Sequence, residues 1–155
     1  MKIFLDTSAL FKLYHKEAET IALQNLFEAN NITSIYLSEI TKIEFASTVW
    51  KKVRTKEITE VDAKQLMQCF EFDYSKFSFI LIDSIITKEA LVLLSKYGSL
   101  GLRTLDSLQL STAVMFKNNT DLFISFDNLL NDFFESENLP TELNNNLSQS
   151  HPEGL

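Results

Sequence analysis

The chain has 155 residues, of which 45% are hydrophobic and 23% charged, as is usual for one globular domain. Its net charge of −7 argues against a generic nucleic-acid binder, although basic residues cluster locally between Lys51 and Lys56. A single cysteine, Cys69, excludes an intrachain disulfide, and there is neither a zinc-binding Cys/His pattern nor an apolar segment long enough to cross a membrane. The first residues lack the features of a signal peptide, so we expect a cytoplasmic protein.

Short apolar or β-branched segments alternate with longer segments of helical periodicity along the chain. Strands are predicted at residues 2–6, 31–38, 77–82 and 121–126, and a last short strand is possible near Leu139. Helices are predicted at residues 8–30 with a break near His15, and at 39–56, 60–77, 84–98, 103–118 and 128–138. Strands separated by helices predict an α/β fold, with a mostly parallel sheet that is covered on both faces.

The composition changes after Pro140, where the chain becomes polar and rich in Asn. No internal repeat and no linker divides the part before it. We therefore expect one domain over residues 1–139 and a loosely ordered tail over residues 140–155.

Four acidic residues occupy comparable places in this pattern. Asp6 ends the first strand, and Asp127 follows the last predicted strand before residue 128. Glu44 lies early in the helix after the second strand, and Asp106 lies near the start of the helix at 103–118. Because ligands bind at the carboxyl edge of a parallel sheet, where helices that follow strands begin, we expect the four carboxylates to converge on one rim.

The helix that carries Asp106 is apolar on nearly all sides, which predicts that it is buried. A carboxylate in such surroundings is costly unless it has a partner, and Arg103 on the same helix is a long, exposed side chain that would serve poorly. Glu44 is less distinctive, because its helix is expected to bury the opposite side. The apolar residues expected on that buried side are Ile40, Ile43, Ala46, Val49, Trp50 and Val53.

Carboxylates that lie close together repel, so a cluster of them either has raised pKa values or recruits a cation. Ligands that are all oxygen atoms suit a hard ion, Mg²⁺ or Mn²⁺. The hydroxyl groups of Thr7, Ser8 and Ser125 can hydrogen-bond to the carboxylates and orient them. An ion held in this way can activate water next to a phosphodiester, which is the chemistry of metal-dependent nucleases.

Each of these residues also has a simpler interpretation. Asp6 and Asp127 can each be the N-cap of the helix that follows, and Asp106 can interact with the helix dipole. The basic cluster from Lys51 to Lys56 can be a solvated helix face. Cys69 and Trp50 are expected in the core. Only the joint arrangement of the four acids favours a functional site.

The motifs together resemble those of PIN domains, and most of all the VapC-like ribonuclease toxins of toxin–antitoxin pairs. The resemblance covers residues 1–139 and depends on "DTSAL", "KIEFAS", "LRTLDSLQLSTA" and "LFISFD". It implies that the family's acidic residues correspond to Asp6, Glu44 (rather than Glu39), Asp106 and Asp127. It also implies a three-layer α/β/α sandwich, Mg²⁺- or Mn²⁺-dependent cleavage of RNA, a homodimer, and a cognate antitoxin protein that blocks the site.

The leading hypothesis is therefore a metal-dependent endoribonuclease that acts as a toxin and has no membrane segment. Asp6 and Asp106 would hold the ion directly, while Glu44 and Asp127 would hold it through water or complete a second ion site. The alternative is a catalytically inactive PIN-like domain that binds a protein partner. A phosphatase or phosphoreceiver is a weaker third possibility, because Ser8 stands where such a phosphatase needs a second Asp.

Overall fold

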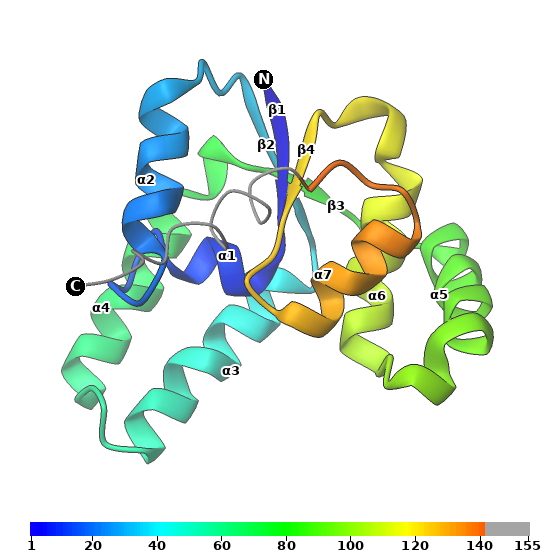
Figure 1. The fold of residues 1–155 in the computed structure, drawn as a ribbon. Helices are drawn as coiled ribbons and strands as arrows, with labels where there is room; N and C mark the ends of the chain where they lie inside the picture. The colour runs from blue at the N-terminus through cyan, green and yellow to red at the C-terminus, as the bar shows by residue number, and fades with distance from the viewer. Residues whose placement is uncertain (142–155) are drawn as a thin grey trace, which may run out of the picture.

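The structure, a computed structural model that describes residues 1–141, is built around a four-stranded sheet (Figure 1). In spatial order, the strands are β3 (Ser78–Ile80), β2 (Ser34–Ser38), β1 (Lys2–Leu5) and β4 (Leu122–Ile124). Ile3 of β1 pairs with Ile35 on one side and with Leu122 on the other, so β1 is a central strand. All three pairings are parallel, and the strands therefore end at the same edge of the sheet.

Seven α-helices surround the sheet in the described part of the chain, and α1 to α4 lie on one face while α5 to α7 lie on the other (Figure 1). They are α1 (Thr7–Phe11), α2 (Thr20–Ala29), α3 (Thr41–Arg54), α4 (Glu60–Phe72), α5 (Ser84–Tyr97), α6 (Thr104–Met115) and α7 (Asn128–Ser136). Short 3₁₀ turns occur at Tyr74–Lys76, Gly98–Leu100 and Lys117–Asn119. None of the helices in residues 1–141 is both long and apolar enough to span a bilayer.

Two separate cores follow from the alternation of side chains along the central strand. Ile3 and Leu5 are fully buried in a core that also contains residues of α1, α2, α3 and α4. Phe4 points to the opposite face, where it packs with Phe123 of β4 and Phe134 of α7. A sheet that is buried on both faces by helices confirms the predicted three-layer α/β/α sandwich and its parallel sheet.

Several element boundaries differ from those predicted. The helix predicted at 60–77 ends at Phe72, because a 3₁₀ turn redirects the chain into β3, which is three residues long. The helix predicted at 84–98 ends at Tyr97, and Gly101, with φ of 107°, turns the chain after α5. Near Leu139 no strand forms within the described residues, although the Pro140 carbonyl accepts a hydrogen bond from the Phe123 amide at 2.8 Å. Most of the predicted tail, residues 142–155, lies outside the described residues.

The orientation of α3 also differs from the prediction. Ile43 and Trp50, expected in the core, are 67% and 39% exposed, whereas Phe45 and Val49 are completely buried. Phe45 stacks 4.3 Å from the ring centroid of Phe70 on α4, and this aromatic contact helps to set the buried face of the helix. As a result Glu44 is half-buried instead of lying opposite the core.

Two further burial predictions are wrong. Cys69 is exposed on α4, because Phe70 is the residue of that turn that enters the core. The helix α6 is not buried on all sides, since Leu105 and Met115 are 47% and 44% exposed. Asp106 is accordingly half-buried, at a place where α6 borders solvent.

Candidate active site

Asp6 lies where β1 ends and is the N-cap of α1, with only 3% of its surface exposed. Its Oδ1 accepts a hydrogen bond from the Ala9 amide at 2.9 Å, and the Ser8 hydroxyl donates to both carboxylate oxygens at 2.7 and 2.9 Å. Ser125, beyond the end of β4, donates to Oδ2 at 2.8 Å. The capping role considered from the sequence is therefore present, together with hydroxyl contacts that a simple cap does not need.

Burial raises the pKa of Asp6 to about 6, even though the hydrogen bonds from Ala9, Ser8 and Ser125 lower it; the nearby Glu44 carboxylate adds to the rise. Within the described residues, no lysine, arginine or histidine forms an ion pair with Asp6. The site therefore buries a carboxylate without supplying a cation for it.

Glu44 projects from the first turn of α3 toward Asp6 and α6. Its Oε1 accepts hydrogen bonds from the Thr7 hydroxyl at 3.0 Å and from Gln109 Nε2 at 2.7 Å. Burial is the main reason that the pKa of Glu44 is raised, and the charge of Asp106 raises it further. Glu44 thus belongs electrostatically to the same cluster as Asp6 and Asp106, in contrast to the solvated glutamate that its sequence position allowed.

Asp106 lies in the first turn of α6, and its carboxylate has no hydrogen bond or ion pair with any side chain in residues 1–141. Burial raises its pKa, the charge of Asp127 raises it further, and Arg103 opposes both effects. Arg103 forms no ion pair with Asp106 in the described residues, although its charge acts on the carboxylate. A half-buried carboxylate with a raised pKa and no protein partner is a ready ligand for a cation.

Asp127 is the N-cap of α7 and accepts a hydrogen bond from the Leu130 amide through Oδ1 at 2.9 Å. Its own amide donates to the Ser125 hydroxyl at 3.1 Å, which in turn donates to Asp6. Ser125 therefore links the residue at the end of β1 to the residue that follows β4. Asp127 is the most exposed of the four acids.

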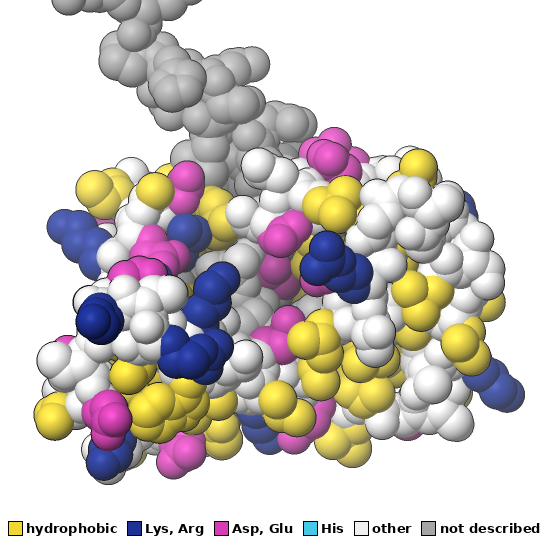
Figure 2. All heavy atoms as spheres, turned by 90° about the horizontal axis from the view of Figure 1, so that it is seen from below, with side chains coloured by type: hydrophobic (Ala, Val, Ile, Leu, Met, Phe, Trp, Pro, Cys, Tyr) yellow, Lys and Arg dark blue, Asp and Glu magenta, His cyan; other side chains and the backbone are white. Residues whose placement is uncertain are grey.

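All four acids line one groove of about 510 Å³ at the carboxyl edge of the sheet. Figure 2 looks onto this edge and shows acidic side chains around a central hollow, with basic side chains beside it. The groove is also lined by Thr7, Ser8, Phe11, Lys12, Glu17, Thr48, Lys51, Lys52, Glu57, Gln109, Phe126 and Leu130. The convergence predicted from the sequence is found, whereas Glu39 does not line the groove and instead pairs with Lys42 at 2.6 Å.

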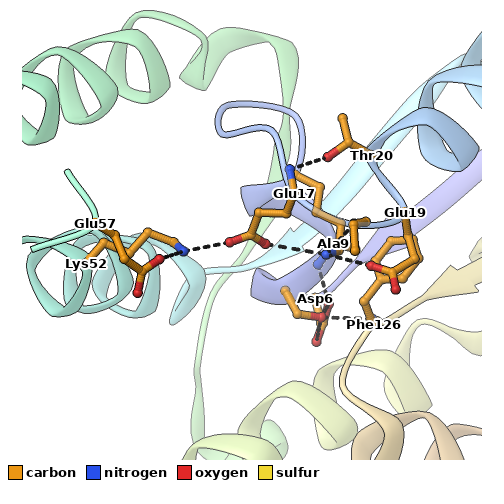
Figure 3. Close-up of polar contacts among 11 residues, drawn as sticks. Asp6, Ala9, Glu17, Glu19, Thr20, Lys52, Glu57 and Phe126 are labelled. Carbon is orange, nitrogen blue, oxygen red and sulfur yellow. Dashed lines mark hydrogen bonds and ion pairs between the residues drawn. The ribbon is translucent and has the colours of Figure 1, made fainter. Parts of the chain in front are cut away.

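Of the three lysines that line the groove, Lys12 and Lys52 are paired with other acids (Figure 3), whereas Lys51 forms no ion pair within the described residues. Glu17 joins two of them, with Oε1 at 2.8 Å from Lys52 Nζ and Oε2 at 3.4 Å from Lys12 Nζ. Lys12, only 8% exposed, also lies 3.1 Å from Glu19, and Lys52 lies 2.9 Å from Glu57. These ion pairs leave the charge of Asp6, Glu44 and Asp106 without a counter-ion from this part of the chain.

The donor atoms of the groove fit a hydrated hard cation. In residues 1–141, no group of three Asp, Glu, His or Cys side chains is close enough to form a metal site on its own. Mg²⁺ commonly retains several waters and takes only one or two carboxylates from the protein, so the open arrangement of Asp6 and Asp106 suits it. The charge that lacks a partner in the groove is the second reason to expect a cation here.

One participant was missed from the sequence. Gln109 lies one turn after Asp106 on α6, is 1% exposed, and donates to Thr7 and Thr41 as well as to Glu44. Its spacing of three residues from Asp106 places both on the same side of the helix, which is the signal that could have identified it.

Comparisons with known proteins agree with this geometry. The sequence model of the PIN domain matches residues 3–133. The fold is similar to that of the sarcin–ricin-loop-cleaving toxin VapC20 of Mycobacterium tuberculosis, with a TM-score of 0.62, 18% identity, and coverage of 86% of this chain and 94% of that one. No protein among those with curated functions matches the sequence.

Two further solved structures have a similar fold. A toxin–antitoxin complex from Klebsiella pneumoniae gives a TM-score of 0.56 at 20% identity, over 79% of this chain and 84% of the other. VapBC2 from Rickettsia felis, bound to a DNA fragment from its promoter, gives 0.54 at 20% identity, over 81% and 86%. At such identities the structures establish a shared fold.

Proposed function

Because the chain belongs to the PIN-domain family, as its motifs predicted, we propose that it is a metal-dependent endoribonuclease and the toxin of a toxin–antitoxin pair. The observation that supports this most strongly is the groove in which Asp6, Glu44 and Asp106 all have raised pKa values. None of the three forms an ion pair with a lysine, arginine or histidine of the described residues. A divalent ion would relieve their repulsion.

In this proposal Asp6 and Asp106 hold Mg²⁺ or Mn²⁺. Hydrogen bonds from Ser8, Ala9 and Ser125 fix the Asp6 carboxylate at the end of β1. When bound, the ion would polarise water and offset the charge that develops on a phosphodiester during hydrolysis.

Glu44 and Asp127 have a complementary role, either through water or at a second ion. Each carboxylate uses one oxygen for hydrogen bonds within the protein, Oε1 in Glu44 and Oδ1 in Asp127. The second oxygen of each has no partner among residues 1–141 and can accept a hydrogen bond from water in the groove. Both side chains can thereby orient the attacking water.

The substrate would be RNA, and its backbone would pass the end of the groove that Lys12, Lys51 and Lys52 line. Lys51 is exposed and makes no ion pair in the described part of the chain, whereas the other two are held by Glu17. Lys51 is therefore the side chain that we assign to a phosphate.

We expect Lys51→Ala to weaken RNA binding several-fold and to lower the salt dependence, d log K/d log [salt], by ~0.7, the value for one phosphate contact on a single strand. Binding of a labelled, uncleaved RNA to the Asp106→Asn protein at several salt concentrations measures this. Lys88→Ala is the matched control, because Lys88 is an exposed residue of α5 that does not line the groove, and it should leave both quantities unchanged. An equal effect of the two substitutions would contradict the assignment.

The partners follow from the same proposal. A cognate antitoxin would block the acidic groove, and a homodimer would be the form that acts in the cytoplasm. Solved structures with this fold include toxin–antitoxin complexes, which supports an antitoxin as the partner class.

The decisive experiment incubates the purified chain, free of other proteins, with structured RNA. We expect cleavage with Mg²⁺ or Mn²⁺, complete loss with a chelator, and recovery when the ion is added back. Calorimetry with Mn²⁺ on the same protein tests binding without turnover. A chain that neither cleaves RNA nor binds Mn²⁺ would contradict the proposal and favour the inactive, protein-binding PIN-like domain.

A further inference from the structure

Gln109 makes an unusual set of contacts for a buried side chain. Its Nε2 carries two hydrogens but has three acceptors within reach, Thr41 Oγ1 at 3.0 Å, Thr7 Oγ1 at 3.1 Å and Glu44 Oε1 at 2.7 Å. Its Oε1 is buried and has no hydrogen-bond partner in the described residues. A buried polar atom without a hydrogen-bond partner destabilises the fold. An apolar side chain would therefore fill the space between α6 and α3 better than this glutamine does.

The contacts of Gln109 all lead to elements that carry the acidic cluster. Thr7 opens α1 directly after Asp6, Thr41 opens α3 three residues before Glu44, and Gln109 itself lies three residues after Asp106. The amide group therefore joins the three helices that present these carboxylates.

The shortest of these bonds also determines which oxygen of Glu44 is available. Gln109 and Thr7 both donate to Oε1. Oε2 accepts no hydrogen bond from the described residues, and it is not a buried atom. Because Glu44 lines the groove, Oε2 is exposed to the groove. Without the two donors, the flexible glutamate side chain could rotate about its torsions and present either oxygen, or neither.

We propose that Gln109 is a positioning residue that holds Oε1 of Glu44 so that Oε2 faces the ion and water of the groove. The inference rests on the proposed nuclease function and adds a residue outside the acidic set. Gln109 acts through Glu44 and touches neither substrate nor ion. Its buried, unsatisfied Oε1 is the cost of placing an amide donor at this position.

The test is Gln109→Met, which keeps the length of the side chain and removes both the donor and the unsatisfied oxygen. We expect the protein to remain folded, with kcat for RNA cleavage and the affinity for Mn²⁺ each lowered ~10–100-fold, as for other outer-shell partners of a metal site. The KM for RNA should stay the same. Gln68→Met, on the exposed face of α4, is the matched control and should change none of these quantities.

A double-mutant cycle separates positioning from a general structural effect. If Gln109 acts through Glu44, then Gln109→Met should have little further effect on kcat or Mn²⁺ affinity in a Glu44→Gln background. Full additivity of the two substitutions, or wild-type kcat and Mn²⁺ affinity in Gln109→Met, would overturn the inference. Should Gln109→Met fail to fold, Thr41→Val removes one contact of the amide at constant shape, and the same loss in smaller measure is expected.

A crystal structure distinguishes failure of the inference from failure of the proposed function. If the wild-type chain neither binds Mn²⁺ nor cleaves RNA, the proposed function fails, and the orientation of Glu44 decides the inference alone. A Glu44 side chain that keeps its wild-type rotamer in Gln109→Met would overturn it. A rotated or disordered Glu44 would support it.

Discussion

Asp106→Asn should abolish the metal-dependent cleavage of RNA and lower its rate by more than ~100-fold. The loss of a residue that only supports a metal ligand already lowers activity up to ~100-fold, and Asp106 is proposed as a ligand itself. The substitution keeps the shape of the side chain and removes its charge. Because the Asp106 carboxylate has no hydrogen bond or ion pair within residues 1–141, the substitution removes no direct contact there. It removes the attraction for the cation and the weaker attraction of Arg103. The relief of repulsion with Asp127 should leave the fold at least as stable as before.

The measurement is the initial rate of cleavage of one structured RNA over a range of Mg²⁺ and Mn²⁺ concentrations, together with thermal unfolding of each variant. Asp132→Asn is the matched control, because Asp132 is an exposed aspartate of α7 outside the groove, and it should retain full activity. A folded Asp106→Asn protein with near-normal cleavage would remove Asp106 from the proposed metal site.

The stability of the metal-free protein should fall as the pH rises from about 4 to about 7, and Asp6 should account for much of the change. The pKa of Asp6 is about 6 in the folded chain and about 3.9 in an unfolded one, so the folded state binds more protons between these values. Stability is then highest below pH 4 for this group and is lost as the pH passes 6. At roughly 1.36 kcal/mol per pH unit, the loss amounts to about 3 kcal/mol.

Asp6→Asn isolates this contribution from the other titrating groups. We expect the variant to be more stable than the wild type by about 3 kcal/mol at pH 7 and equally stable near pH 4. An asparagine at this position can still accept the hydrogen bond from Ala9 through Oδ1, and its amide can donate to the hydroxyl oxygens of Ser8 or Ser125. The cap of α1 is therefore preserved.

Urea unfolding in the presence of chelator, at intervals between pH 4 and pH 8, provides the difference curve between the two proteins. Saturating Mn²⁺ should stabilise the wild type at pH 7 and leave Asp6→Asn unchanged, because only the wild type binds the ion in its folded state. The prediction would be contradicted if the difference in the free energy of unfolding did not depend on pH, or if the variant were less stable than the wild type at pH 7. Either result would show that the ionised Asp6 does not destabilise the metal-free fold.

The fold, and the position of the four acids at one edge of the sheet, could be predicted from local patterns. The strand before Asp6, the periodicity around Asp106 and the alternation of strands with helices are all short-range signals, and together they predict a parallel sheet with its acids at one edge. Such signals do not determine which side of a helix faces the core. The burial of Phe45 rather than Ile43 on α3 depends on partners in α1 and α4, which only the folded chain brings together.

The contacts of Gln109 were not predicted from the sequence for a related reason. In a helix that is apolar on most sides, a single glutamine gives no indication of its partners, because its hydrogen bonds with Thr7, Thr41 and Glu44 span up to 102 positions of chain. The pairing of Lys12 and Lys52 through Glu17 is equally hidden, because it joins a loop to a helix through long side chains whose rotamers have no sequence signature. Tertiary packing decides both.

The place of β4 in the sheet has a consequence for synthesis on the ribosome. Asp6 emerges almost first, yet one side of β1 and the Ser125 hydroxyl bond come from segments 119 positions later. While β4 has not yet emerged from the ribosome, the nascent chain has neither the second neighbour of its central strand nor Asp127. Under the proposed nuclease function, a chain assembled in this order would be unable to cleave RNA until its synthesis is nearly complete.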